Sequence, residues 1–192
     1  VGIDYTERDL ADVVWKNARF VRCRFVGARL TEATLSGCVF EECDFSGAQL
    51  NAATLTHCTL TDCRLAGARL FVAHLEGCRL IGADLADADL GGATLIGCDL
   101  SYANLRHQSL AKRDLRGTKL EGADLTGADL SGADLRGVDL RGARLAEALL
   151  VKTDLRDADL DRVDLRVVAF DRTRIDVAQA GLFARSHGAQ IG

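Results

Sequence analysis

Residues 121–145 read EGADLTGADLSGADLRGVDLRGARL, and a leucine recurs at every fifth position of this stretch. A small residue, alanine or valine, stands two places before each leucine, and a glycine follows most leucines by two places. A period of five spreads leucines around an α-helix and sends them to alternate faces of a flat strand. Because the small residue and the leucine are two apart, they point to the same side. The chain is therefore expected to turn a corner once per five residues and to coil around its leucines.

The cysteines indicate how many five-residue units make one coil. All seven occupy the small position, and they form two series with a spacing of twenty residues: Cys23, Cys43, Cys63 and Cys38, Cys58, Cys78, Cys98. Phe20 and Phe40 have the same spacing, as do Phe25 and Phe45. Identical residues twenty apart are expected to stack, so one coil contains four units and has a square section. Neighbouring coils would lie ~4.8 Å apart, the usual strand spacing.

The repeated A(D/N)LXX pattern resembles that of pentapeptide repeat proteins, as in Ala83-Asp84-Leu85, Ala103-Asn104-Leu105 and Ala123-Asp124-Leu125. This resemblance implies an all-β fold, a right-handed quadrilateral β-helix. From Leu10 to Ile175 every fifth residue is Leu, Phe, Trp or Ile, without one insertion or deletion. We therefore expect a pentapeptide-repeat β-helix over residues 1–175 with no loop between coils. Residues 1–19 follow the repeat weakly and are expected to form a frayed or capping first coil.

Residues 176–192 follow a different rule and are predicted to form a C-terminal helical cap and dimerisation tail. Asp176 suits a helix N-cap, residues 177–187 have helical spacing, and Gly188 suits the stop. One interpretation is a lid that plugs the open end of the solenoid, where strand edges are otherwise exposed. Its apolar side would contain Ile175, Ala178, Leu182 and Phe183. The other is a lid that also pairs with its copy, for which Phe183 and Ile191 are candidates.

Two adjacent small positions hold long polar residues, Gln108 and Arg113. A long polar side chain is not buried without partners. Either the coil bulges so that these side chains escape, or they pair inside. A local distortion is the simpler interpretation; a kink between two coaxial but offset half-rods, ending near Leu105 and starting near Leu120, is the functional one.

Charge differs between the two halves of the chain. Residues 1–82 carry 9 basic and 10 acidic side chains, whereas residues 83–170 carry 12 basic and 16 acidic ones. In the second half the residue before the leucine is mostly aspartate. Aspartate is common in corner turns, which on sequence alone is the favoured explanation. Rows of aspartates on a stiff rod could also imitate the phosphates of a DNA duplex. The net charge of −4 disfavours nucleic acid as a direct ligand.

Several kinds of chemistry have no support in the sequence. There is no long apolar run or charged-then-apolar leader, so neither a membrane span nor a secretory signal is expected. Methionine is absent, so residue 1 is not expected to be the natural start. The inward cysteines indicate reduced thiols, core packing and a cytoplasmic protein. The four histidines lack a nucleophile partner, CxxC pairs are missing, and no phosphate loop is present. We expect no catalytic residue, metal or cofactor, and hence no enzyme.

Within the family, the chain resembles the mycobacterial fluoroquinolone-resistance members, through its unbroken register and its tail with Ile175-Asp176-Val177, Phe183-Ala184 and His187-Gly188. That resemblance implies a non-enzymatic homodimer of DNA-like width that binds DNA gyrase in place of DNA and protects it from fluoroquinolones. Either the cleavage-reunion region or the ATPase region of gyrase could be the contact. The predicted partner-binding residues are Asp84, Asp89, Asp99, Asp124, Asp129, Asp134, Asp139, Asp154, Asp159 and Asp164. The predicted dimer residues are Ile175, Val177, Leu182, Phe183 and Ile191.

A rigid protein-interaction scaffold with no topoisomerase partner is the alternative. It would use exposed apolar residues such as Phe71, Val72, Ile81 and Ile96 instead of charge. Binding through the aspartates is expected to collapse with salt, whereas binding through apolar residues survives it. A small enzyme or metal protein is a third class, which the residues do not favour.

Overall fold

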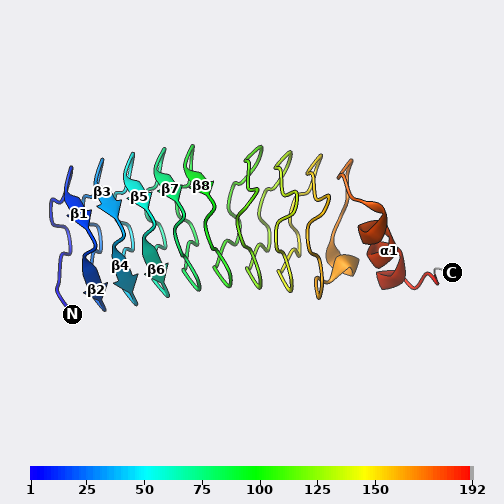
Figure 1. Cartoon of the computed structure of the whole chain (residues 1–192), viewed down its shortest axis with the longest axis horizontal. Coiled ribbons are helices and arrows are strands. Elements are labelled where there is room, and N and C mark those ends of the chain that lie inside the picture. Colours follow the sequence, from blue (N-terminus) through cyan, green and yellow to red (C-terminus); the bar gives the residue numbers. More distant parts are fainter. Residues whose placement is uncertain (191–192) are drawn as a thin grey trace.

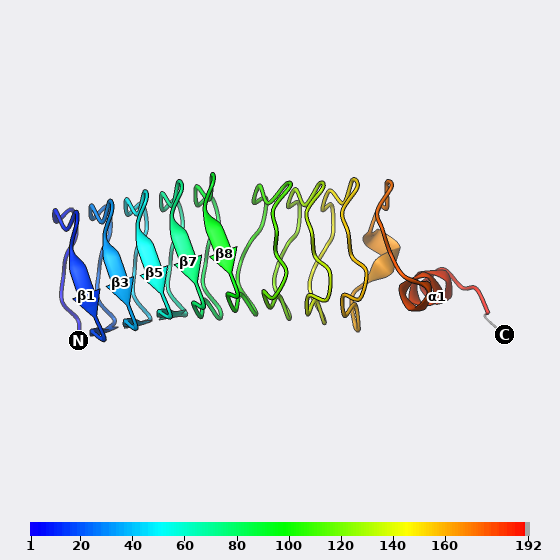
Figure 2. The same cartoon turned by 45° about the horizontal axis from the view of Figure 1, so that its top comes forward.

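The chain forms a β-solenoid in the computed structural model, which describes residues 1–190. Its coils stack along a rod, with the N-terminus at one end and helix α1 (Val177–Ser186) at the other (Figure 1). One face of the rod carries a parallel sheet of β1 (Val14–Lys16), β3 (Thr34–Ser36), β5 (Thr54–Thr56), β7 (His74–Glu76) and β8 (Thr94–Ile96), which form one row in Figure 2. A second face carries β2 (Arg19–Val21), β4 (Val39–Glu41) and β6 (Thr59–Thr61).

The coils stack in the predicted twenty-residue register. Strands β1 and β3 pair in parallel with Trp15 opposite Leu35, and β2 pairs with β4 so that Phe20 lies opposite Phe40. Single parallel bridges extend the register over other faces, as between Asp154 and Arg174. The predicted quadrilateral β-helix with a short C-terminal helix is therefore confirmed.

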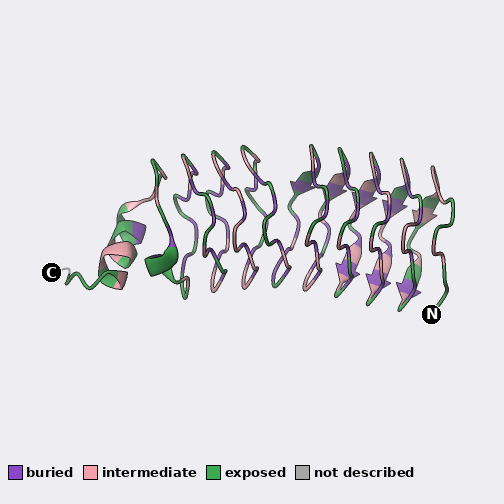
Figure 3. Cartoon of the chain, turned by 180° about the vertical axis from the view of Figure 1, so that it is seen from behind, coloured by how far each residue is buried: buried purple, intermediate pink, exposed green. Residues whose placement is uncertain are grey.

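The core is a ladder of leucines, phenylalanines and small residues that runs along the rod (purple in Figure 3). The rings of Phe25 and Phe45 are stacked with centroids 4.6 Å apart, and those of Phe20 and Phe40 are stacked at 5.0 Å. In the first coil Tyr5 is half-buried and stacks on Phe25 at 4.8 Å. Each fully buried leucine or phenylalanine contributes roughly 1.5–3 kcal/mol relative to exposure, so the ladder is the main source of stability.

The corner of each unit lies at the second residue after the leucine. This residue has a positive φ at every corner from Glu7 to Arg162, for example 68° at Gly127. Glycine adopts this left-handed conformation without steric cost, which explains its recurrence. Val72, with φ 51°, is a rarer case because its branched side chain disfavours the conformation.

Helix α1 begins where the sequence predicts. Asp176 is the N-cap, and its carboxylate accepts the Gln179 N–H at 2.9 Å while the Gln179 side chain accepts the Asp176 N–H at 3.0 Å. This reciprocal capping box satisfies two N–H groups that a helix start leaves free. The helix ends at His187, the C-cap, followed by Gly188 with φ 86°.

The side of α1 that faces the coils differs from the prediction. Gln179 is buried, and its Nε2 donates to the carbonyls of Leu155 at 2.6 Å and Ala158 at 2.8 Å. Ala178 and Leu182, which were expected to face the coils, are exposed. The helix is rotated because the last coil leaves carbonyls that need a donor, and an amide supplies it where an apolar side chain cannot. No helix within residues 1–190 has the length and apolar character needed to cross a membrane.

Candidate functional site

The ten predicted aspartates share one local structure. Each precedes an inward leucine, so its side chain points out of a face of the rod, just before a corner. In all ten, Oδ1 accepts the N–H of the residue two places further on, at 2.9 to 3.3 Å; Asp129 accepts from Ser131 at 2.9 Å. The aspartates thus stabilise the corners themselves, as the turn explanation predicts.

These aspartates are spread over all four faces of the rod. By register, the four groups are Asp84, Asp124 and Asp164; Asp89 and Asp129; Asp134 and Asp154; and Asp99, Asp139 and Asp159. Among the described residues, two members of the set stack directly on neighbouring coils only at Asp134–Asp154 and Asp139–Asp159. Elsewhere Asn104, Ser109, Lys119 or Arg144 intervenes. The structure therefore does not gather the ten into one continuous acidic row.

Arginines two residues further on neutralise several of these carboxylates. The Nη2 of Arg156 lies 2.7 Å from Asp154, and that of Arg166 lies 2.8 Å from Asp164. In both pairs Nε contacts the other carboxylate oxygen, so the contact is bidentate. The hydrogen bonds from these guanidinium groups hold the pKa of Asp154 and the pKa of Asp164 at about 2. Asp134 and Asp139 have the same kind of partner, Arg136 and Arg141 respectively, at 2.7 Å.

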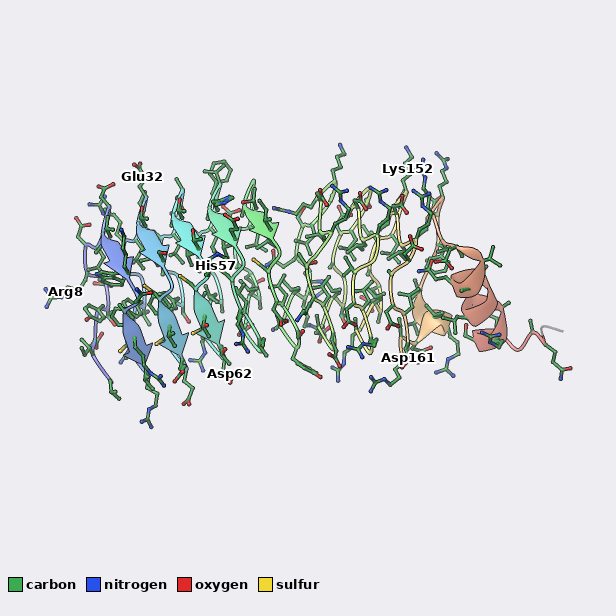
Figure 4. The ribbon with its side chains drawn as sticks, in the orientation of Figure 1. Arg8, Glu32, His57, Asp62, Lys152 and Asp161 are labelled. Carbon is green, nitrogen blue, oxygen red and sulfur yellow. The ribbon has the colours of Figure 1, made fainter. Side chains whose placement is uncertain are left out.

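Three of the predicted aspartates, Asp84, Asp89 and Asp129, have no arginine or lysine within ion-pair distance in the part of the chain that the structure describes. Asp84 instead accepts the side-chain amide of Asn104 at 2.8 Å. Charged side chains of both signs project along the rod, with Glu32 and Lys152 at one edge and Asp62 and Asp161 at the opposite edge of Figure 4. The surface is a mixed-charge surface, and unpaired carboxylates are a minority among the ten predicted aspartates.

The apolar residues of the scaffold alternative do not form one patch either. Phe71 and Val72 occupy one corner, where they are about half-exposed and pack over Gly91 and Gly92 of the next coil. A Cβ on Gly92 would lie 2.9 Å from the Val72 side chain, so glycine is needed to make room. Ile81 and Ile96 lie at two other corners.

The cysteines are buried free thiols, as the packing prediction requires. The Sγ atoms of all of them except Cys23 donate to carbonyls of the preceding coil, for example from Cys78 to Leu55 at 3.3 Å and from Cys58 to Leu35 at 3.4 Å. Residues 1–190 contain no group of three or more His, Cys, Asp or Glu side chains placed to hold a metal ion.

The side chains of Gln108 and Arg113 both find main-chain hydrogen-bond partners inside the solenoid. The Nε2 of Gln108 donates to the carbonyls of Leu85 at 2.7 Å and Ala88 at 3.0 Å. The two terminal nitrogens of Arg113 donate to the carbonyls of Ala93 and Leu90. Burial lowers the pKa of the Arg113 guanidinium. Of the two alternatives, pairing inside the solenoid is therefore the one present, and a cleft of about 850 Å³ opens between two coils at these residues.

The residues predicted for a dimer fall into two groups. Val177 is 89% exposed and Leu182 is 38% exposed, so both are available to a second copy. Ile175 and Phe183 are half-buried against the chain's own core, and the Phe183 ring lies 5.0 Å from that of Phe170. Ile191 lies outside the described residues.

Sequence reasoning missed Gln179. Its position three residues after Asp176 signals a capping box, but nothing in the local sequence shows that its amide also closes the last coil.

The repeat is recognised by two family models. The model of pentapeptide repeats matches residues 23–62, 48–85, 128–166 and 139–174, and the model of a pentapeptide repeat region matches residues 68–145. The chain is a pentapeptide repeat protein. Neither model describes an enzyme family. None of the curated proteins matches the chain.

The chain is similar to several solved structures. Full-length QnrB1, a plasmid-mediated fluoroquinolone resistance protein, is 26% identical over 98% of both chains, with a TM-score of 0.81. A trypsin-treated QnrB1 variant is 25% identical over 100% of this chain and 98% of its own, with a TM-score of 0.66. HetL, involved in heterocyst differentiation regulation in the cyanobacterium Nostoc, is 34% identical over 90% of this chain and 82% of its own, with a TM-score of 0.44. The scaffold is thus similar to that of a quinolone-resistance protein.

Proposed function

We propose that this pentapeptide repeat protein binds DNA gyrase without catalysing a reaction and protects it from fluoroquinolones. The observation that carries the proposal is the end-to-end match with QnrB1, which extends over 98% of both chains. A stiff rod with carboxylates repeating every coil offers a basic, DNA-binding groove a surface of the right sign. The contact is with the protein, not with nucleic acid or membrane, and takes place in the cytoplasm, where the thiols stay reduced.

The contact surface is proposed to include the ten corner aspartates, with unequal weight. Asp84, Asp89 and Asp129 lack a basic partner, so their charge is free to interact with an approaching protein. Aspartates held by an arginine, such as Asp134 and Asp154, present a nearly neutral pair. We assign DNA mimicry to the unpaired carboxylates because a neutralised pair attracts a basic groove weakly.

A homodimer through the C-terminal tail belongs to the same proposal. Val177 and Leu182 are exposed apolar residues on α1 and form its contact surface. Ile175 and Phe183 pack on the core of their own chain and so hold α1, with its contact surface, against the last coil. Leu182→Asp is expected to give a folded monomer in sedimentation velocity, and an intact dimer of the variant would contradict this arrangement.

A gyrase supercoiling assay tests the main proposal. Titrating the protein into gyrase poisoned by a fluoroquinolone is expected to restore supercoiling. The triple variant Asp84→Asn, Asp89→Asn, Asp129→Asn is expected to lose most of this protection, whereas Asp134→Asn, Asp139→Asn, Asp154→Asn retains more of it. No effect of the native protein, with or without drug, would overturn the proposal.

The scaffold alternative rests on Phe71 and Val72, exposed at one corner. It predicts a partner whose binding survives 0.5 M salt. At about 0.1 M salt, surface charges are already screened beyond about 10 Å, and at 0.5 M the screening is stronger. Phe71→Ser would then abolish binding, and the aspartate variants would not.

A further inference from the structure

The backbone hydrogen bonds between two particular coils are missing. At a regular interface an inward leucine donates to the coil that follows, as Leu70 does to the Asp89 carbonyl at 2.7 Å. The equivalent bonds of Leu90 to Ser109 and of Leu95 to Asp114 are not made within the described chain. The returning bonds, from the N–H groups of Ser109 and Asp114 to the preceding coil, are not made there either.

The loss is confined to two adjoining faces of the rod. On the other two faces the same coils stay joined, with Leu85 N–H to the Asn104 carbonyl at 3.0 Å and Leu100 N–H to the Lys119 carbonyl at 2.8 Å. The coils therefore separate as a wedge that is open at the corner of residues 91–92 and 111–112. Figure 1 shows the wider step after β8.

Two inward side chains hold the wedge open. Gln108 and Arg113 occupy the carbonyls of Ala88 and Ala93, which the main chain of the next coil would otherwise use. Their length exceeds that of the alanines and cysteines at other small positions, so the coils cannot close to the usual ~4.8 Å here. The side chains span the interior of the wedge, and the space beside them is lined by the inward Leu90, Leu95 and Leu115 and opens at the outer corner.

Both walls of the cleft present main-chain groups with the spacing of a β-strand. One wall offers the N–H groups of Leu90 and Leu95, and the facing wall offers the N–H and carbonyl groups of Ser109 and Asp114. An extended polypeptide carries donors and acceptors along both edges, whereas a small anion carries acceptors alone. We propose that this cleft binds an extended segment of a partner polypeptide, which enters as an additional strand between the two coils.

The charges at the cleft define the side chains of that segment. Arg106 pairs with Asp124 at 3.4 Å and Arg116 with Asp114 at 2.6 Å, whereas Arg113 has no carboxylate partner within residues 1–190. Two of its five N–H donors are directed at the carbonyls of Leu90 and Ala93, which leaves three for a ligand.

The inserted segment is therefore expected to carry a carboxylate on its inward side, next to Arg113. Its apolar residue would continue the leucine ladder between Leu95 and Leu115. Asp87 and Asp89 line the outer rim and are exposed, so they disfavour a second acidic residue on the outward side.

The probe is a fluorescent peptide based on the chain's own repeat. Residues 126–135 read TGADLSGADL, and in the register the alanine of the second unit stacks on position 113. The peptide TGANLSGENL, acetylated and amidated, carries a glutamate at that position and asparagine in place of the two outward aspartates. Fluorescence anisotropy against the full chain is expected to detect binding. The peptide with glutamine there should bind at least fivefold more weakly, and N-methylation of both leucines should abolish binding.

A protein variant closes the cleft. Gln108→Ala with Arg113→Ala restores the small residues of the repeat and is expected to weaken peptide binding at least tenfold, while circular dichroism reports the β-helix. Thr153→Ala is the matched control, because it removes an inward polar side chain that donates to the Leu130 carbonyl at 2.8 Å away from the cleft. Equal affinity of the double variant and the control, or no binding to the native chain, would overturn the proposal. Displacement of the peptide by millimolar inorganic phosphate would assign the cleft to a small anion instead and would overturn it as well.

Discussion

The two interfaces on either side of residues 86–97 contain the same leucine ladder but differ in hydrogen bonding. Upstream, Ala88 and Ala93 stand at the small positions and the coils are joined, with the Asp89 N–H donating to the Ala68 carbonyl at 2.8 Å. Downstream, Gln108 and Arg113 stand at those positions and the corresponding bonds are lost. Leucines therefore bury the core at both interfaces, but the size of the residue two places earlier decides whether neighbouring coils close.

The C-terminal end of the rod uses the same chemistry for a different result. Gln179 of α1 donates to Leu155 and Ala158, just as Gln108 donates to Leu85 and Ala88. In both places one amide takes the alanine carbonyl that a following coil would have engaged, and also donates to a leucine carbonyl that already accepts an N–H of its own coil. At the end of the rod this closes the solenoid, whereas inside the rod it interrupts it.

Core truncation is expected to give the largest difference between the closed and the open interface. Leu70→Ala at the closed interface should lower the free energy of unfolding by about 2–5 kcal/mol. Leu90→Ala should cost less, because Leu90 borders the cleft and the site can relax or admit water. Urea denaturation monitored by circular dichroism measures both, with exposed Leu182→Ala as the control. Equal losses at the two sites would contradict the difference in packing.

Removing the wedge is the next largest change. Gln108→Ala with Arg113→Ala should raise the free energy of unfolding by about 1.5–4.5 kcal/mol. Closing the interface forms seven main-chain hydrogen bonds, the four described above and those of the corner N–H groups of Asp87, Gly92 and Gly97, in place of four side-chain ones. The net gain is three hydrogen bonds of roughly 0.5–1.5 kcal/mol each. The reverse variant, Ala68→Gln with Ala73→Arg, should open a regular interface and lower stability. Thermal melts of the two variants measure whether stability rises in the first and falls in the second. A destabilised double-alanine variant would show that the open interface does not lower the stability of the native chain.

Much of this architecture was predictable from the sequence, and the reason is physical. A strict period of five leaves one way to bury every leucine, and the cysteines at positions 38, 58, 78 and 98 fix the coil length. The interruption at Gln108 was predictable because long polar residues break the small-residue rule. The rotation of α1 was not, because it depends on carbonyls of Leu155 and Ala158 that no local pattern reveals.

The candidate surface was predicted less well than the fold. The sequence identifies every corner aspartate, but charge pairing depends on side-chain direction across and along coils. Arg156 turns back to Asp154 and neutralises it, whereas Asp129 has no such neighbour in ion-pair distance among residues 1–190. An account based on net charge alone cannot distinguish these two aspartates.

The terminal cap is expected to give a smaller effect than the wedge. Gln179→Ala removes the donor to Leu155 and Ala158 and one half of the capping box, so it should lower the free energy of unfolding by about 1–2 kcal/mol. The loss should appear first as faster proteolysis of the α1 segment. Gln190→Ala, an exposed glutamine beyond the helix, is the control. Identical proteolysis of both variants would contradict the role of the amide.

The smallest expected effect is a dependence of stability on pH from the corner ion pairs. The pKa of Asp164 is held at about 2 by Arg166, below its usual value near 3.9, so the ionised form is favoured in the folded state. This contribution is complete above about pH 4 and is lost as the pH falls toward 2. Arg166→Gln should reduce the slope of melting temperature against pH in that window. An unchanged slope would mean that the pair does not influence stability.

Amide hydrogen exchange at single-residue resolution tests most directly whether long inward side chains open the solenoid. Fast exchange is expected at Leu90 and Leu95 in the native chain beside slow exchange at Leu70. Gln108→Ala with Arg113→Ala is expected to make all three amides exchange slowly. Equal protection of the three amides in the native chain would show that the coils are joined there, and would contradict both the open interface and the binding cleft built on it.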